Sequence, residues 1–221
     1  MILALDTTSE FGSIALVESG SILAETHLHS PDGLAHVLFG ALAAVLHRAG
    51  RKLKDVDIFA AANGPGSFTG VRVGLTAIKG MAEAHDKPVA AISNLRALAA
   101  CGSEPCRAVL LDARRGEVYA AVYDDRLANI EPEIVTGLNS WLDGLREPRY
   151  EFVTFAGAPF RSAAAGTRFA EMTWTEASRF LAPAIALCAE QDAAHGKLIS
   201  ALAADANYVR SSDAELLWRD R

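Results

Sequence analysis

The sequence predicts an α/β protein built from two related halves, and two observations support this. Each half opens with an apolar strand that ends at an aspartate, Asp6 or Asp112, followed by a turn through glycine and a second apolar strand. After these strands, the first half alternates buried strands with amphipathic helices. That alternation is typical of a sheet covered by helices.

The elements of the first half follow from local signals. Gly20 lies in a turn between two strands, Gly50 closes a helix, and Pro88 follows the end of another. The predicted elements are strands at 2–5, 13–17 and 21–29, a helix to about 49, a strand at 57–62, a helix at 71–85, a strand at 89–92 and a helix at 94–100. The first three strands form an antiparallel meander.

The segment Gly102–Pro105 is the predicted boundary, which divides the chain into lobes 1–103 and 104–221. The second half is less regular. Its predicted elements are strands at 108–111, 117–123, 133–136 and 152–156, and helices at 141–145, 182–194, 197–203 and 213–218. Two lobes that each start with a meander describe an actin-like (ribonuclease H-like) fold, with a mixed sheet in each lobe.

In such folds the two aspartate-bearing hairpins face a shared cleft that holds nucleotide phosphates. The candidate binding residues are therefore Asp6, Thr7, Thr8, Ser13 and Asp112. The alternative is that these side chains cap the turns in which they lie, as aspartate and threonine commonly do. This alternative is favoured for Asp112.

A glycine-rich stretch follows the strand at 57–62 and precedes the helix at 71–85. Such a turn presents backbone N–H groups and the positive end of a helix dipole, which suits an anion. No Gly-Lys-Ser/Thr follows, so it is not a P-loop, and a structural turn is the favoured interpretation. Its key residues are Gly64, Gly66, Ser67, Thr69, Gly70 and Arg72.

The helix that ends near residue 49 is apolar around more than half of its circumference, which indicates burial on more than one side. We therefore predict contact with a partner, although alanine-rich surface is the plainer explanation. The predicted interface residues on this helix and the next are Leu34, Val37, Leu38, Leu42, Val45, Val71, Leu75 and Ile78.

Composition excludes several classes of protein. The 221 residues carry a net charge of −6, so the chain as a whole offers no basic face for gripping RNA. Three cysteines without a CxxC pair indicate neither a disulfide framework nor a zinc site. No basic signal region and no apolar run long enough to cross a membrane are evident, so we expect a cytoplasmic protein.

Four motifs together carry a family resemblance. They are LALDTTS at 3–9, GPGSFTGVRVG at 64–74, LDARRGEVYAAVY at 111–123 and NYVR at 207–210. In order and spacing they resemble the bacterial TsaB family, non-catalytic subunits in the synthesis of tRNA threonylcarbamoyladenosine. The resemblance covers nearly all of the first half and anchor points in the second.

The resemblance implies a scaffold without a cofactor of its own. Its expected partners are a larger catalytic paralogue (TsaD-like), a P-loop ATPase (TsaE-like) and, through the complex, tRNA. The resemblance assigns ATP use to the partners and allows ATP or ADP at the interface of the complex. It implies a homodimer for the protein alone. The paralogue binds metal through His-x-x-x-His, and no two of the six histidines here are four residues apart.

Two other functions stay open from the residues alone. The first is a nucleotide-using, small-molecule kinase-like enzyme with Asp6 and Asp112 in its cleft. The second is a glycoprotease-like metalloprotease, which lacks ligand spacing here, since His27 and His29 share a strand face without an acidic ligand close in sequence. The basic residues considered for anionic contacts are Arg72, Arg96, Arg114 and Arg115.

Overall fold

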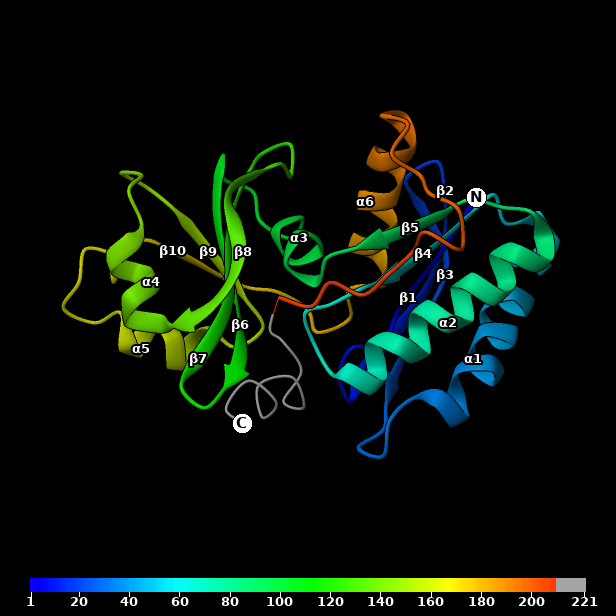
Figure 1. The fold of residues 1–221 in the computed structure, drawn as a ribbon, viewed down its shortest axis with the longest axis horizontal. Helices are drawn as coiled ribbons and strands as arrows, with labels where there is room; N and C mark the ends of the chain where they lie inside the picture. Colours follow the sequence, from blue (N-terminus) through cyan, green and yellow to red (C-terminus); the bar gives the residue numbers. More distant parts are fainter. Residues whose placement is uncertain (210–221) are drawn as a thin grey trace, which may run out of the picture.

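A computed structural model of the chain describes residues 1–209 and contains two five-stranded mixed sheets, one in each half of the molecule (Figure 1). The first sheet has the order β3-β2-β1-β4-β5 and the second β10-β9-β6-β7-β8. In both, three consecutive strands form an antiparallel meander and the remaining strands pair in parallel. The predicted two-lobed α/β fold is confirmed.

The first half contains five strands and four helical segments. These are β1 (Ile2–Asp6), β2 (Phe11–Glu18), β3 (Ser21–His29), α1 (Ala35–Arg48), the 3-10 helix η1 (Leu53–Asp55), β4 (Ile58–Ala62), α2 (Phe68–His85), β5 (Val89–Ile92) and α3 (Asn94–Ala99). Each of the strands and α-helices predicted for this half is present. The sequence pattern missed only the short η1.

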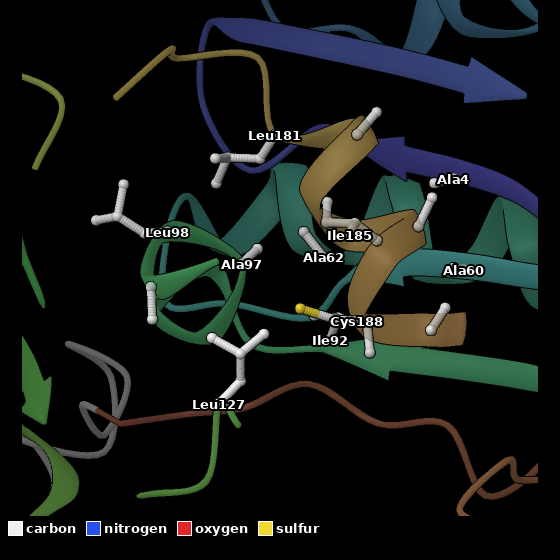
Figure 2. Packing of buried hydrophobic residues seen from close by; sticks show 14 of the residues in the cluster. Ala4, Ala60, Ala62, Ile92, Ala97, Leu98, Leu127, Leu181, Ile185 and Cys188 are labelled. Atoms are coloured by element: carbon white, nitrogen blue, oxygen red, sulfur yellow. The ribbon is translucent and has the colours of Figure 1, made fainter. Parts of the chain in front are cut away.

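Alternation along β1 divides the first core into two layers. Leu3 and Leu5 point to the face covered by α1 and α2, while Ile2 and Ala4 point to the opposite face. Helix α6 (Ala182–Ala194) packs on that opposite face, where Figure 2 shows Ile185 and Cys188 of α6 against Ala62 and Ile92 of the sheet. Helix α3 packs against α6 and the second sheet. The sheet of the first half is therefore buried on both sides.

The second half forms its own sheet, which has a separate hydrophobic core on one face. Its elements are β6 (Cys106–Arg114), β7 (Glu117–Asp124), β8 (Asn129–Gly137), α4 (Leu138–Gly144), β9 (Glu151–Thr154), α5 (Gly157–Ala163) and β10 (Thr173–Glu176). A separate aromatic core includes Trp141, Phe152 and Phe169. The predictions for α4, α6 and β6 to β9 are confirmed, whereas α5 and β10 were missed.

The helix predicted at 197–203 is wrong. Gly196 has a φ of +66° directly after α6, and Ile199 then pairs with Val89 of β5 through two backbone hydrogen bonds of 2.8 and 3.0 Å. The chain is therefore extended at Ile199 and continues as a strap along the first half. The helix predicted at 213–218 lies outside the described residues.

The connection between the two sheets is held by one buried carboxylate. Glu151 of β9 accepts hydrogen bonds of 2.7 Å from the backbone N–H groups of Ser103 and Glu104. The proposed division at 103/104 stays a prediction. Helix α6 belongs to the second segment in sequence but packs on the sheet of the first.

Candidate functional site

The end of β1 forms a closed polar network. Asp6 is 3% exposed, and its Oδ1 accepts hydrogen bonds from the backbone N–H of Thr8 at 2.9 Å and from the Thr8 hydroxyl at 2.7 Å. The side-chain amide of Asn94 donates to the Thr8 hydroxyl at 2.8 Å. Burial raises the pKa of Asp6, against the opposing effect of the hydrogen bonds from Thr8 and Asn94.

Asn94 extends this network to the glycine-rich turn. Its Oδ1 accepts from the backbone N–H of Gly64 at 3.1 Å, and its own backbone N–H donates to the Gly64 carbonyl at 2.8 Å. The Gly64–Pro65 peptide bond is cis. Hydrogen bonds among Thr8, Asn94 and Gly64 therefore connect the end of β1, the start of α3 and the turn after β4.

The glycines allow the start of α2 to lie directly on the backbone of Thr7 and Thr8. A Cβ at Gly70 would lie 2.1 Å from the Thr7 carbonyl oxygen, and one at Gly66 would lie 2.7 Å from that of Thr8. The Thr7 hydroxyl donates to the Gly70 carbonyl at 2.7 Å. Ser67 caps α2 by accepting from the N–H of Gly70. These contacts agree with the interpretation favoured from the sequence, in which the glycine-rich stretch is a structural turn.

Ser13 has a structural partner as well. It is fully buried, and its hydroxyl accepts a hydrogen bond of 2.9 Å from the backbone N–H of Ala182, at the start of α6. The polar residues predicted to line a phosphate site in the first half thus bind other parts of the chain. They join the hairpin of β1 and β2 to α2, α3 and α6.

The corresponding hairpin of the second half is open. Asp112 is exposed, and its Oδ1 accepts from the backbone N–H of Arg114 at 2.7 Å, so it caps its own turn. Arg114, Arg115 and Gly116 all have positive φ, at 63°, 56° and 79°. Two pockets in the described chain, one over α1 and α2 and one beside Ile199, are lined by neither Asp6 nor Asp112.

Arg96 is unsuited to the anionic contact considered for it. Its guanidinium forms an ion pair of 2.9 Å with Asp192 of α6, and both side chains are largely buried. This pair joins α3 to α6. The prediction is corrected because the counter-charge comes from within the chain.

The larger of these pockets is an apolar groove of about 640 Å³ over α1 and α2. Figure 1 shows these two helices side by side on the outer face of the first half. Phe39 of α1 is 60% exposed and Phe68 of α2 is 46% exposed. The groove is lined by Ala35, Leu38, Phe39, Leu53, Phe68, Thr69, Arg72, Val73, Thr76, Ala77, Gly80, Met81 and Ala84.

The residues predicted as the partner interface lie mostly on the inner side of these helices. Seven of them are buried, and only Val37 is partly exposed. The buried residues are Leu34, Leu38, Leu42, Val45, Val71, Leu75 and Ile78. Because they fill the chain's own core, the choice of residues is corrected: the accessible surface of α1 and α2 is the groove.

One rim of the groove carries a cluster that sequence reasoning missed. The Arg72 guanidinium lies 3.8 Å from the centroid of the Phe68 ring, and its Nε donates to the Tyr208 hydroxyl at 3.3 Å. The rings of Phe68 and Tyr208 are 5.8 Å apart. Arg72 and Tyr208 are 136 residues apart in the sequence. Each lies in one of the motifs that carry the family resemblance, and this is the signal that could have paired them.

The strap from Ile199 to Val209 brings Tyr208 to this position. The Lys79 ammonium donates to the Ala204 carbonyl at 2.8 Å, and the backbone N–H of Asn207 donates to the Asn63 carbonyl at 2.8 Å. The Asn207 side chain also donates to Glu133 of β8. The strap therefore contacts α2, the end of β4 and the second sheet (Figure 1).

The two histidines on β3 have protein partners. His27 stacks on Phe180 with ring centroids 3.9 Å apart and lies 2.7 Å from Glu25, an acidic neighbour that the sequence reasoning overlooked. His29 stacks on Phe11 at 4.5 Å. Among residues 1–209, no group of three or more histidine, cysteine, aspartate or glutamate side chains is arranged to hold a metal ion.

The same part of the chain contains no helix that is both long and apolar enough to cross a membrane.

Comparison with known proteins identifies the family. The family model "TsaD: tRNA N6-adenosine threonylcarbamoyltransferase" matches residues 33–147, which is more than half of the chain. The tRNA threonylcarbamoyladenosine biosynthesis protein TsaB of Bacillus subtilis is 33% identical over 151 residues, covering 66% of each chain. TsaB of Haemophilus influenzae is 40% identical over 124 residues, covering 53% of this chain and 51% of its own.

A solved structure matches along nearly the whole length. It is described as an uncharacterized protein from Pseudomonas aeruginosa with similarity to peptidase YEAZ, and it superposes with a TM-score of 0.79 at 26% identity, covering 95% of this chain and 99% of its own. YeaZ from the same species superposes with a TM-score of 0.74. The actin-like fold is thus confirmed.

The aligned segments span between about half and two thirds of the curated TsaB relatives, while the structural likeness extends across both lobes. By sequence and by fold, the chain belongs to the family that the TsaD model describes, and within it to the TsaB proteins.

Proposed function

We propose that this protein is a non-catalytic scaffold in the synthesis of tRNA threonylcarbamoyladenosine, and that it pairs with a catalytic TsaD-type protein through the α1/α2 groove. The reaction that it supports is transfer of the threonylcarbamoyl group to the adenosine next to the anticodon, in tRNAs that read codons starting with A. A TsaE-type P-loop ATPase and tRNA join the complex, and any ATP or ADP binds at its interface. The complex works in the cytoplasm.

The observation that carries this proposal is the groove itself. Exposed phenylalanines on two adjacent helices, over a groove with one charged lining residue, are typical of a surface that a partner covers. The family relationship supports the identity of that partner, since the family model that matches this chain is itself named for the transferase. A second copy of this protein occupies the groove when the partner is absent.

The non-catalytic role is supported by the hydrogen bonds of the residues that were predicted to bind phosphate in the first half. Asp6 is buried and accepts two hydrogen bonds from Thr8. Thr7, Thr8 and Ser13 bind Gly70, Asn94 and Ala182 in turn. They hold three helices in position. Their hydrogen bonds favour a structural role over phosphate binding.

The test is pairing of the Phe39→Ser variant with the TsaD-type protein of the same organism. Phe39 is mostly exposed, so the variant should fold, and loss of an aromatic anchor should weaken pairing at least ~10-fold. Light scattering after size exclusion measures the complex. Leu202→Ser is the matched control, because Leu202 is 85% exposed and does not line the groove.

Two results would count against the proposal. One is a protein that stays monomeric and ignores the TsaD-type protein. The other is equal pairing by the Phe39→Ser variant and by wild type. Modification of tRNA in a reconstituted mixture, with and without this protein, then separates a scaffold from a bystander.

The kinase-like enzyme stays the second candidate. It would use Asp6 and Asp112, and binding of ATP to the isolated protein would favour it. Loss of that binding in Asp112→Asn, whose carboxylate is exposed, would locate the nucleotide at the second hairpin.

A further inference from the structure

The rim of the groove holds a fixed cation. The Cζ atom of Arg72 lies 3.8 Å from the centroid of the Phe68 ring, and Nε donates a hydrogen bond to the Tyr208 hydroxyl. Stacking on a ring and one hydrogen bond together restrict a side chain that is otherwise among the most flexible. The guanidinium is thus oriented before any partner arrives.

This cation lacks a counter-charge in the described chain. Within residues 1–209, Nε is the one nitrogen of Arg72 that has a hydrogen-bond acceptor. The terminal amino groups form the fork that matches a carboxylate in a bidentate pair. No other residue that lines the groove is charged.

We infer that Arg72 selects the partner of this groove by pairing with a carboxylate on an apolar docking segment, and that Phe68 and Tyr208 position its guanidinium. The inference rests on the function proposed above and names the chemistry of the partner at the same surface. An apolar helix with one aspartate or glutamate opposite Arg72 fits the groove.

Charge complementarity distinguishes this partner from a second copy of the chain. If two grooves face each other, each brings an arginine and neither brings a carboxylate from its lining. Covering an unpaired charge with apolar surface is unfavourable. Arg72 therefore makes pairing with an acidic heterologous partner tighter than self-pairing, which occurs when that partner is absent.

Tyr208 acts through Arg72 as a positioning residue. It is 49% exposed and comes from the strap, whereas the groove comes from α1 and α2. The NYVR and GPGSFTGVR motifs are thereby joined in one surface. Loss of the Tyr208 hydroxyl frees the guanidinium to rotate but leaves the charge in place.

The experiment measures hetero-pairing and self-pairing of Arg72→Met at low and high salt. Methionine keeps much of the length and apolar character of arginine and removes the charge. We expect hetero-pairing with the TsaD-type protein to weaken about 10-fold to 100-fold and to lose most of its salt dependence. Self-pairing should stay equal or become tighter. Arg161→Met, on α5 of the other half, is the matched control.

Tyr208→Phe gives the second measurement. It should weaken hetero-pairing about 2-fold to 5-fold without changing the thermal unfolding temperature, because a half-exposed hydroxyl contributes little to stability. In the Arg72→Met background the same change should have no effect on pairing. An equal effect in both backgrounds contradicts the positioning role.

The outcomes separate this inference from the proposed function. If Phe39→Ser weakens hetero-pairing and Arg72→Met does not, the groove stands and the role of Arg72 is wrong. If Arg72→Met weakens both kinds of pairing equally, the residue acts through packing and the inference is overturned. If neither variant matters, both proposals fail. A variant truncated after Val209 lacks the acidic residues of the C-terminal segment and so tests whether they supply the counter-charge of Arg72. If hetero-pairing of this variant loses its salt dependence, the inference is also overturned.

Discussion

The two halves of this protein place the same motif in opposite surroundings. Asp6 ends β1 and Asp112 lies two residues before the end of β6. Each aspartate accepts a hydrogen bond from the backbone N–H two residues on. Asp6 is buried under the glycine-rich turn and bound to Thr8, whereas Asp112 is exposed in a tight hairpin.

The difference arises from the segment that comes after the neighbouring parallel strand. In the first half, β4 leads into the 18-residue helix α2, whose first turn lies on the β1–β2 connection. In the second half, β9 leads into the seven-residue helix α5. A sequence repeat thus indicates shared topology, while the covering segment decides whether an aspartate stabilises the fold or stays accessible.

The largest expected loss of stability comes from adding a methyl group at Gly70, where α2 covers the first hairpin. Gly70→Ala places a Cβ 2.1 Å from the Thr7 carbonyl oxygen, so α2 and β1 must move apart. We expect the free energy of unfolding in urea to fall by about 3 kcal/mol or more.

Gly116→Ala is the matched change in the open hairpin. Apart from residues 115–117, no atom lies within 4 Å of a Cβ built at Gly116, and the cost comes from the φ of +79°, at about 1 kcal/mol. If Gly70→Ala and Gly116→Ala lowered the free energy of unfolding equally, the position of α2 would not depend on its close contact with Thr7.

The second effect compares the aspartates directly. Asp6→Ala removes an acceptor of two buried hydrogen bonds and should cost about 2–4 kcal/mol of unfolding free energy. Asp112→Ala removes one exposed acceptor and should cost about 1 kcal/mol or less. Thermal and urea unfolding measure both. If Asp6→Ala were as stable as wild type, the carboxylate would be free for a ligand, and the nucleotide-binding candidate would gain support.

Local periodicity was sufficient to predict most of the fold. The apolar run at 2–5 indicated a strand, and all five residues of β1 are buried. The spacing of Val71, Leu75 and Ile78 is that of one helix face, and this face of α2 is buried. Short segments failed because they carry little pattern. Strand β10 has no buried side chain, and the stretch around Ile199 is extended because of its pairing with Val89 rather than its composition.

The candidate site was harder to predict for a related reason. The periodicity that reveals an amphipathic helix marks its inner face, so the predicted interface residues turned out to be core. The outer face combines Phe39 with small residues such as Thr76 and Gly80, which resemble ordinary surface in sequence. The contact of Arg72 with Tyr208 depends on the path of the strap, and no local pattern encodes that path.

The third effect is a pH dependence of stability that arises at Asp6, in the covered hairpin. Burial raises the pKa of Asp6, so the native state holds this proton to a higher pH than the unfolded chain, where the ordinary value is 3.8. Its contribution to stability is therefore largest below 3.8 and is lost as the pH rises through the raised pKa.

Asp6→Asn tests this sign. Asparagine keeps an oxygen acceptor for Thr8 and cannot ionise, so the variant should gain stability relative to wild type as the pH rises through that interval. Urea unfolding at several pH values measures the difference. A difference that does not change with pH would contradict the raised pKa.

The smallest effect concerns backbone strain in the open hairpin. Arg114 has a φ of +63°, which costs a side chain other than glycine or asparagine roughly 1 kcal/mol. Arg114→Asn keeps the N–H that donates to Asp112, so we expect unfolding free energy to rise by about 0.5–1 kcal/mol. Arg161→Asn in α5 should instead lower it by a few tenths, because asparagine is a poorer helix former than arginine. If Arg114→Asn were destabilising, the arginine side chain would contribute contacts that outweigh the strain. The open hairpin would then be a structured surface in its own right, and the contrast between the two halves would rest on what each hairpin binds rather than on which of them is covered.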